Sequence, residues 1–173
     1  PCNVIIIIGQ KIYPFDNLRL QTFRKILDGH SNIHVVAEIM GNYDPDASLT
    51  GVQDALQANA DKQIHVILSN ADQHLVGADI ALEDAGYKVE DLFLMGGGAS
   101  SIGLDMVRQG RWDYTKGDFP YSLGMYGTDA VIKHIRGEPY ESEINMDERG
   151  PVPGLINKDV LDKYPDFKGE WRG

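Results

Sequence analysis

The sequence predicts an α/β fold, a doubly wound parallel sheet with helices on both faces. Short apolar runs alternate repeatedly with longer stretches whose apolar residues recur every three or four positions. Most of these runs are continuous, which is typical of strands buried on both faces. Strand, helix and strand in this order indicate right-handed crossovers between parallel strands.

The apolar runs mark the expected strands in order, the first being a run of Val and Ile that ends at Gly9. They predict strands over residues 4–9, 33–40, 64–69, 91–95, 112–115 and, more weakly, 143–146. The segment 111–118 is polar for a central strand, so it is either an edge strand or a passage between two lobes.

The stretches between the runs have helical periodicity. They predict helices over residues 17–27, 47–58, 74–85, 102–108 and 121–135. Glycines follow four of them, where a left-handed C′ residue is expected: Gly29, Gly86, Gly110 and Gly137. From Gly150 the chain becomes rich in Pro and Gly, which predicts an extended segment with a short helix over 158–163.

Length and composition exclude several classes of protein. A chain of 173 residues corresponds to roughly one domain, and its 42% apolar content excludes intrinsic disorder. The 26 acidic and 16 basic residues give a net charge of -10, which disfavours nucleic acid and anionic membranes as partners. The longest apolar run is far shorter than the roughly 20 residues that span a bilayer.

No metal or cofactor is expected. The single Cys2 excludes an internal disulfide and a cysteine-based metal site. The histidines have no ligand spacing on a shared helix face. Asp44 and Asp46 lack the remaining positions of a calcium loop.

Polar residues follow the end of each strand, where open parallel sheets bind ligands. The candidates are Phe15, Asp16 and Arg19 after the first strand, Tyr43 and Asp44 after the second, Asn70 and Asp72 after the third, Gly98 after the fourth and Asp118 after the fifth. Carboxylates, amides and a guanidinium supply the paired donors and acceptors that a polyhydroxyl ligand requires, and the aromatic rings can stack on a sugar. The alternative is that these loops are ordinary surface turns, with Asp16, Asp46 and Asp72 as helix N-caps.

Two enzyme-like patterns are incomplete. Gly96, Gly97 and Gly98 before Ser101 resemble a phosphate-binding turn, but serine replaces the third glycine and the pattern follows the fourth strand. Ser101, Asp129 and His134 have the residue order of an α/β-hydrolase triad. However, the serine lies beyond the strand end, and the acid and histidine share one expected helix. The sequence therefore predicts a protein that is not an enzyme.

Together, these residues make the chain similar to the second half of periplasmic sugar-binding proteins of the ribose-binding type, the substrate receptors of bacterial ABC transporters with the type I periplasmic binding protein fold. The resemblance covers about residues 3–137 and rests on Arg19 with Phe23, Tyr43 with Asp44, Gly110 leading to Pro120, and most specifically on Asn70, Asp72, Gly77, Ala78, Ala81, Leu82, Ala85 and Gly86.

The resemblance implies two flavodoxin-like lobes joined by three strands, with a sugar or polyol bound between them. Residues 1–117 would be the C-terminal lobe, 118–149 a segment of the N-terminal lobe, and 150–173 the return crossing and tail. The chain would then be a C-terminal half, with the missing N-terminal lobe and a membrane permease as partners. The implied location is periplasmic or extracellular, membrane-anchored in some bacteria.

The resemblance also implies roles for single residues. Arg19 matches a ligand-binding arginine, Tyr43 a ring-stacking aromatic, and Asp118 the place of an amide-bearing hinge residue. The pattern departs at Ala71, where an asparagine is expected, and at Gly98, where an aspartate is expected. The glycine run would leave room for a larger or differently oriented polyol.

Two other functions remain open at this point. Effector-binding lobes of lactose-repressor-type regulators share the fold, but their fourth strand usually ends in Gly-Phe-Asp, where this chain has Gly96, Gly97 and Gly98. A small α/β hydrolase is the second alternative, and it depends on the incomplete triad. We expect a solute-binding component of a transporter.

Overall fold

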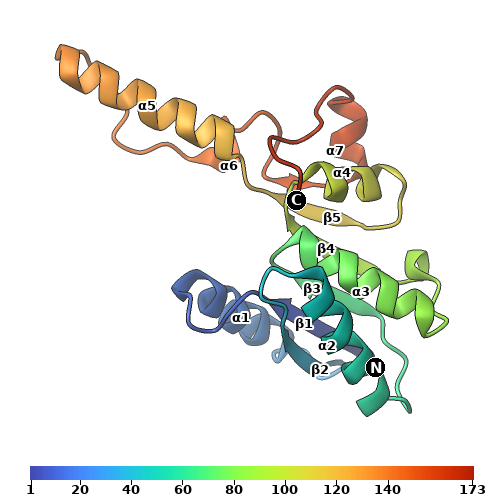
Figure 1. The fold of residues 1–173 in the computed structure, drawn as a ribbon. Helices are drawn as coiled ribbons and strands as arrows, with labels where there is room; N and C mark the ends of the chain where they lie inside the picture. Colours follow the sequence, from blue (N-terminus) through green and yellow to red (C-terminus); the bar gives the residue numbers. More distant parts are fainter.

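The computed structural model describes all 173 residues, and it contains one six-stranded sheet with the order β2-β1-β3-β4-β5-β6 (Figure 1). The first five strands pair in parallel and β6 pairs antiparallel with β5. Without β6 this is the flavodoxin-like strand order, so the predicted fold class is confirmed. The strands are β1 (Cys2–Ile8), β2 (Ile33–Met40), β3 (Val66–Ser69), β4 (Phe93–Gly98), β5 (Tyr114–Gly117) and β6 (Leu155–Ile156).

The helices connect these strands as crossovers up to β5. They are α1 (Pro14–Leu27), α2 (Pro45–Ala58), α3 (Asp72–Asp84), the 3-10 turn η1 (Val89–Asp91), α4 (Ser101–Arg108), α5 (Pro120–Arg136), α6 (Met146–Arg149) and α7 (Lys158–Lys163). Helices α1 to α5 follow β1 to β5 in turn, as the periodicity predicts, whereas the turn η1 was not predicted. No helix is both long enough and apolar enough to cross a membrane.

The alternating side chains of β1 form two cores. Val4, Ile6 and Ile8 pack with Leu20 of α1 on one face. Ile5 and Ile7 belong to the larger core on the other face, together with residues of α2, α3 and α4. The continuous apolar run is therefore buried on both faces of the sheet, as its composition predicts.

The expected strand over 143–146 is wrong. Residues 143–145 have no regular structure, and Met146 begins α6. The side chain of Asn145 caps this helix by accepting the backbone N–H of Asp147 at 3.1 Å, and such a cap favours a helix start over a strand. Strand β6 was not predicted, because its two residues are too few to show a periodic pattern.

The structure differs from the expected helix ends and loops at two places. Gly86, Gly110 and Gly137 have the expected positive φ, and Gly29 does not. The run Gly96 to Gly98 is the end of β4 and not a loop. It pairs with Thr115, Lys116 and Gly117 of β5.

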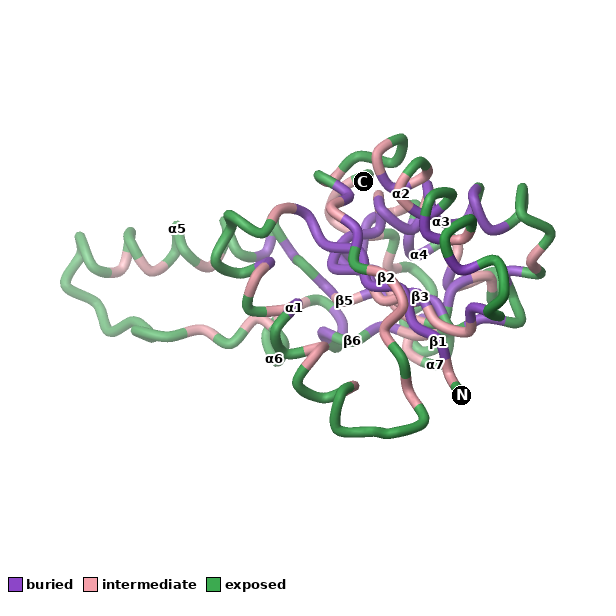
Figure 2. The backbone as a smooth tube through the Cα atoms, turned by 90° about the horizontal axis from the view of Figure 1, so that it is seen from below, coloured by how far each residue is buried: buried purple, intermediate pink, exposed green.

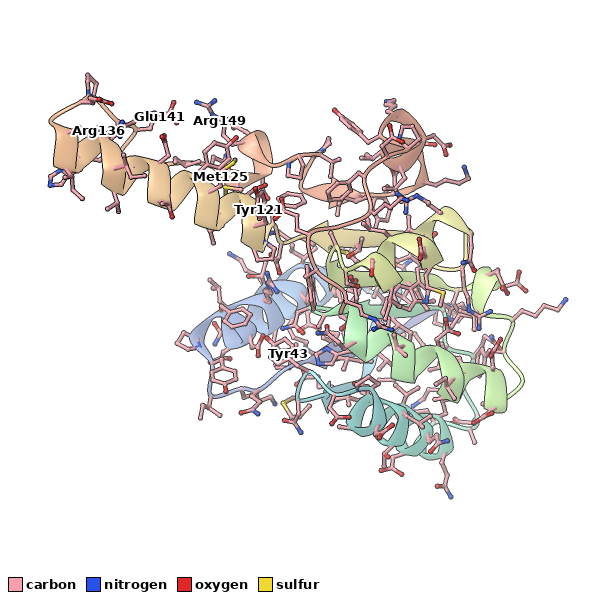
Figure 3. The ribbon with its side chains drawn as sticks, turned by 45° about the horizontal axis from the view of Figure 1, so that its top comes forward. Tyr43, Tyr121, Met125, Arg136, Glu141 and Arg149 are labelled. Atoms are coloured by element: carbon pink, nitrogen blue, oxygen red, sulfur yellow. The ribbon has the colours of Figure 1, made fainter.

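Helix α5 projects away from the sheet as an arm, and the chain returns beside it to α6 (Figure 1). Figure 2 shows the arm exposed along almost its whole length, and Ser122 is the one buried residue of α5. Its exposed side chains include Tyr121 at 72% and Ile135 at 77%. Tyr121 and Met125, labelled on the helix in Figure 3, are both exposed. We call residues 118–149 the arm.

Candidate functional site

Three of the expected loops meet around the buried carboxylate of Asp16, at the carboxyl ends of β1, β2 and β3. The Tyr43 hydroxyl donates to Asp16 Oδ1 at 2.6 Å, and the backbone N–H of Gln10 donates to Oδ2 at 2.7 Å. Asn70 Nδ2 also donates to Oδ1. Because Asp16 is fully buried and its oxygens already accept these bonds, it holds Tyr43 and Asn70 in place.

Asn70 has a polar atom left over. Its Oδ1 is buried and has no hydrogen-bond partner in the protein. A buried acceptor without a donor costs about 1–3 kcal/mol, so a hydroxyl of a bound molecule would be favoured here. The guanidinium of Arg19 lies beside Asn70, where its Nη1 donates to the Asn70 backbone carbonyl at 3.4 Å. It also packs over the ring of Phe15, 5.3 Å from the ring centroid.

Tyr43 is fixed by its backbone as well as by its hydroxyl. Asn42 and Tyr43 have φ of 53° and 58°, a left-handed conformation that is costly for residues other than glycine. The Tyr43 N–H donates to His74 Nε2 at 2.9 Å, and His74 Nδ1 lies 2.9 Å from Ser69 Oγ. Because Nε2 accepts a hydrogen bond, it carries no proton, and the imidazole is neutral.

Burial sets the protonation of these groups. It lowers the pKa of His74 to about 4, against a smaller opposite effect of Asp16. It also raises the pKa of the Tyr43 hydroxyl, an effect that the hydrogen bond to Asp16 reinforces. Both side chains therefore stay neutral at pH 7. The support of Tyr43 by His74 is not predictable from the sequence, because nothing local connects positions 43 and 74.

Asp72 lies inside the structure and links three elements. Its Oδ2 accepts from Ser100 N at 2.9 Å and Ser100 Oγ at 2.8 Å, and its Oδ1 accepts from Thr115 Oγ1 at 2.7 Å. Burial raises its pKa to about 6, and these hydrogen bonds offset part of the rise. An added Cβ at Gly96 or Gly103 would overlap this carboxylate, so the glycines make room for it.

Asp44 is a helix cap. Its Oδ1 accepts the backbone N–H groups of Asp46 at 2.7 Å and Ala47 at 3.1 Å, at the start of α2. The predicted caps were therefore assigned to the wrong residues. Asp16, Asp46 and Asp72 lie inside the first turns of their helices, and Tyr13, Asp44 and Ala71 are the N-cap residues.

Gly98 and Asp118 form a second group, at the ends of β4 and β5. The Asp118 N–H donates to the Gly98 carbonyl at 3.4 Å, and the exposed Asp118 carboxylate pairs with Lys116 at 3.0 Å. The two groups meet at Gly97, where an added Cβ would overlap the Asn70 carbonyl. The expected residues thus lie along one edge of the sheet, with Asp16, Asp44 and Asp72 committed to bonds within the protein.

The enzyme-like patterns are not assembled into a site. Ser101 begins α4, whereas Asp129 and His134 lie on the projecting α5 (Figure 1). Asp129 pairs with Lys133 at 2.6 Å, and His134 packs edge-on against Tyr140. No group of three His, Cys, Asp or Glu residues is placed to hold a metal ion.

Comparison with known sequences gives one match. The family described as periplasmic binding protein domain matches residues 1–139. No curated protein matches the chain.

Solved structures share the fold. An ABC transporter solute-binding protein from Actinobacillus succinogenes with bound D-allose has a TM-score of 0.79 at 21% identity, covering 94% of this chain and 54% of its own. One from Bacillus halodurans with bound myo-inositol has a TM-score of 0.75 at 21% identity, covering 94% and 53%. A galactofuranose binding protein has a TM-score of 0.79 at 17% identity, covering 97% and 56%. The chain spans about half the length of these structures.

Proposed function

The chain belongs to the periplasmic binding protein domain family, and from this premise we propose that it is the solute-binding part of a bacterial ABC transporter, with a sugar or polyol as ligand. Its location is then periplasmic or extracellular, and its protein partner is the membrane permease. It binds its ligand without chemical turnover. The sugars and the polyol named for the similar structures support this class of ligand.

The observation that carries the proposal is the buried, unpartnered Oδ1 of Asn70 beside Arg19 and Tyr43. In this proposal a ligand hydroxyl donates to Asn70 Oδ1, the Arg19 guanidinium donates to a ligand oxygen, and the half-exposed ring of Tyr43 packs on an apolar face of the ligand. The Asp16 carboxylate holds Tyr43 and Asn70 without touching the ligand, and Arg19 is positioned by the Asn70 backbone carbonyl and the Phe15 ring. Such prearranged groups lower the cost of ordering the site on binding.

The arm supports the proposed division of the protein into lobes. We assign residues 1–117 to one lobe, 118–149 to a second lobe and 150–173 to the return crossing and tail. An isolated helix with apolar side chains in water on several sides gains little from packing, and α5 buries only Ser122. Residues of a second lobe would cover this surface. Ligand contacts to both lobes would then favour a closed state over an open one.

Titration calorimetry of the full-length protein tests the proposal. The panel contains D-allose, myo-inositol, a galactofuranoside and common aldoses, with an amino acid mixture as the negative set. We expect saturable 1:1 binding of at least one sugar or polyol. A folded protein that binds none of them, as judged by an intact melting transition, would contradict the proposed ligand class.

A further inference from the structure

The last residues of the chain run over the end of β4, beside the start of α4 (Figure 1). The Trp171 carbonyl accepts the backbone N–H of Ser101 at 2.9 Å. The Glu170 carboxylate accepts the Ser122 N–H at 2.9 Å, in the first turn of α5. Gly169 has a φ of 84° and lies against the Ala99 carbonyl. These contacts fix the backbone on both sides of Trp171.

The indole of Trp171 covers Gly98. Its Nε1–H donates to the Gly98 carbonyl at 2.6 Å. A Cβ added at Gly98 would overlap the six-membered ring of the indole, so position 98 can have no side chain of its own while the indole is there. The side chain presented at the end of β4 therefore comes from residue 171.

The indole continues the row of candidate ligand groups. Arg19 contacts the Asn70 carbonyl, and Gly97 packs against the same carbonyl. The backbone carbonyl of the next residue, Gly98, accepts both the indole N–H of Trp171 and the backbone N–H of Asp118. Trp171 and Asp118 line a common cavity of about 490 Å³ with Phe119, Leu123 and Met146. The half-buried indole keeps a surface on this cavity.

We propose that Trp171 is a specificity-determining ligand contact, an apolar wall against which one C–H face of the sugar or polyol packs. This inference rests on the proposed function. Because the indole N–H is already used by Gly98, the side chain has only its π surface to offer, and this surface gives no hydrogen bond to a hydroxyl. The ligand is therefore selected for an unsubstituted or equatorially substituted face at this end, with its polar groups directed to Asp118 and to Asn70.

Binding to Trp171 variants tests this inference on the full-length protein, with a sugar that the wild-type protein binds in the panel. We expect Trp171→Ala to weaken binding about tenfold or more, and Trp171→Phe, which keeps an aromatic face, to weaken it by only a fewfold. Tyr164→Ala removes another aromatic residue of the same tail and is the matched control, with unchanged affinity expected. Affinity of Trp171→Ala within twofold of wild type would overturn the inference.

A fluorescence measurement keeps the test valid if Trp171→Ala disturbs the tail. Trp112 is 2% exposed and its Nε1 donates to Asp79 at 2.9 Å, so it is shielded from quencher in the folded protein. The part of the acrylamide quenching that is present in the wild-type protein and absent in Trp171→Phe is therefore due to Trp171. We expect saturating sugar to reduce this component by half or more. Unchanged quenching in the presence of bound sugar would overturn the inference but leave the proposed function standing, whereas wild-type protein that binds no sugar would remove both.

Discussion

The neutral imidazole of His74 accepts the backbone N–H of Tyr43, at 2.9 Å, and so holds a strained residue of the candidate site from helix α3, which lies one strand further along the chain. The consequence is a link between protonation and the geometry of Tyr43. A second proton on His74 would convert the acceptor Nε2 into a donor that faces another donor.

His74 should make stability depend on pH. Its folded pKa of about 4 lies below the ordinary 6.5, so between these values the unfolded chain binds a proton that the folded chain does not. The free energy of unfolding should therefore fall as pH is lowered from about 6.5 to about 4. Urea denaturation across this range should give a smaller fall for His74→Gln. His134→Gln, on the exposed α5, is the control and should retain the wild-type slope; equal slopes for all three proteins would refute the prediction.

Asp72 should act in the opposite direction. Its folded pKa of about 6 lies above the ordinary 3.8, so its contribution to stability is present at low pH and is lost as pH rises through about 6. We expect the free energy of unfolding of Asp72→Asn minus that of the wild-type protein to rise between pH 4 and pH 6.5 in the same denaturation series. Asp84→Asn, exposed on the same helix, should show no such trend, and a flat difference for Asp72→Asn would count against the prediction.

Arg19→Ala should weaken ligand binding by about 1.5–3 kcal/mol, because a charge-assisted hydrogen bond is lost. Titration calorimetry with the sugar found in the panel measures this loss. Arg24→Ala is the matched control on the same helix, since Arg24 pairs with Asp28 and Glu38 away from Asn70. A loss of similar size in both variants would mean that the charge of α1, and not a contact of Arg19, is responsible.

Tyr43→Phe should separate stability from binding. The substitution removes the hydroxyl that donates to the buried Asp16, which should lower the free energy of unfolding by about 1–3 kcal/mol at pH 7. The ring that is proposed to pack on the ligand remains, so affinity should change by less than threefold. Tyr13→Phe, at a more exposed ring, should change neither quantity. A Tyr43→Phe protein that unfolds at the wild-type denaturant midpoint would contradict the prediction.

The arm should be the first site of proteolysis in the 173-residue chain. It carries exposed cleavage sites at Tyr121 and Arg136, and few of its side chains are buried. Limited trypsin and chymotrypsin digestion, read by mass spectrometry, should cut within residues 118–149 before the sheet region. In the full-length protein the same bonds should be protected by the second lobe; equal cleavage rates in both proteins would contradict the assignment of the arm to that lobe.

Much of the fold could be predicted from local patterns. The buried run of Val and Ile in β1 and the helical periodicity of α1 to α5 are properties of short windows, and the right-handed crossover then limits the possible strand orders. The pairing of β6 with β5 is different, since it joins residues about forty positions apart. The glycine run at the end of β4 was also open to several interpretations, because its reason lies in the Asp72 carboxylate, the Asn70 carbonyl and the Trp171 indole.

The candidate site divides in the same way. The rule that ligand groups follow the ends of parallel strands predicts from the sequence alone that Arg19, Tyr43 and Asn70 lie at one edge of the sheet. The rule does not say which of the polar residues have free hydrogen-bonding atoms. Asp16, Asp44 and Asp72 have theirs occupied, and this depends on contacts such as Ser100 to Asp72 that cross between separate loops.

The chain leaves the sheet through β5 and comes back through β6, which lies directly beside it. Thr115 is in register with Ile156, and the Gly117 N–H donates to the Gly154 carbonyl at 2.6 Å. The chain therefore leaves and re-enters the sheet at Gly117 and Gly154, which lie about one strand spacing apart, roughly 4.8 Å. A body fastened at two neighbouring points turns most easily about the line that joins them, so this geometry restricts the segment to tilting in essentially one direction and resists its twisting.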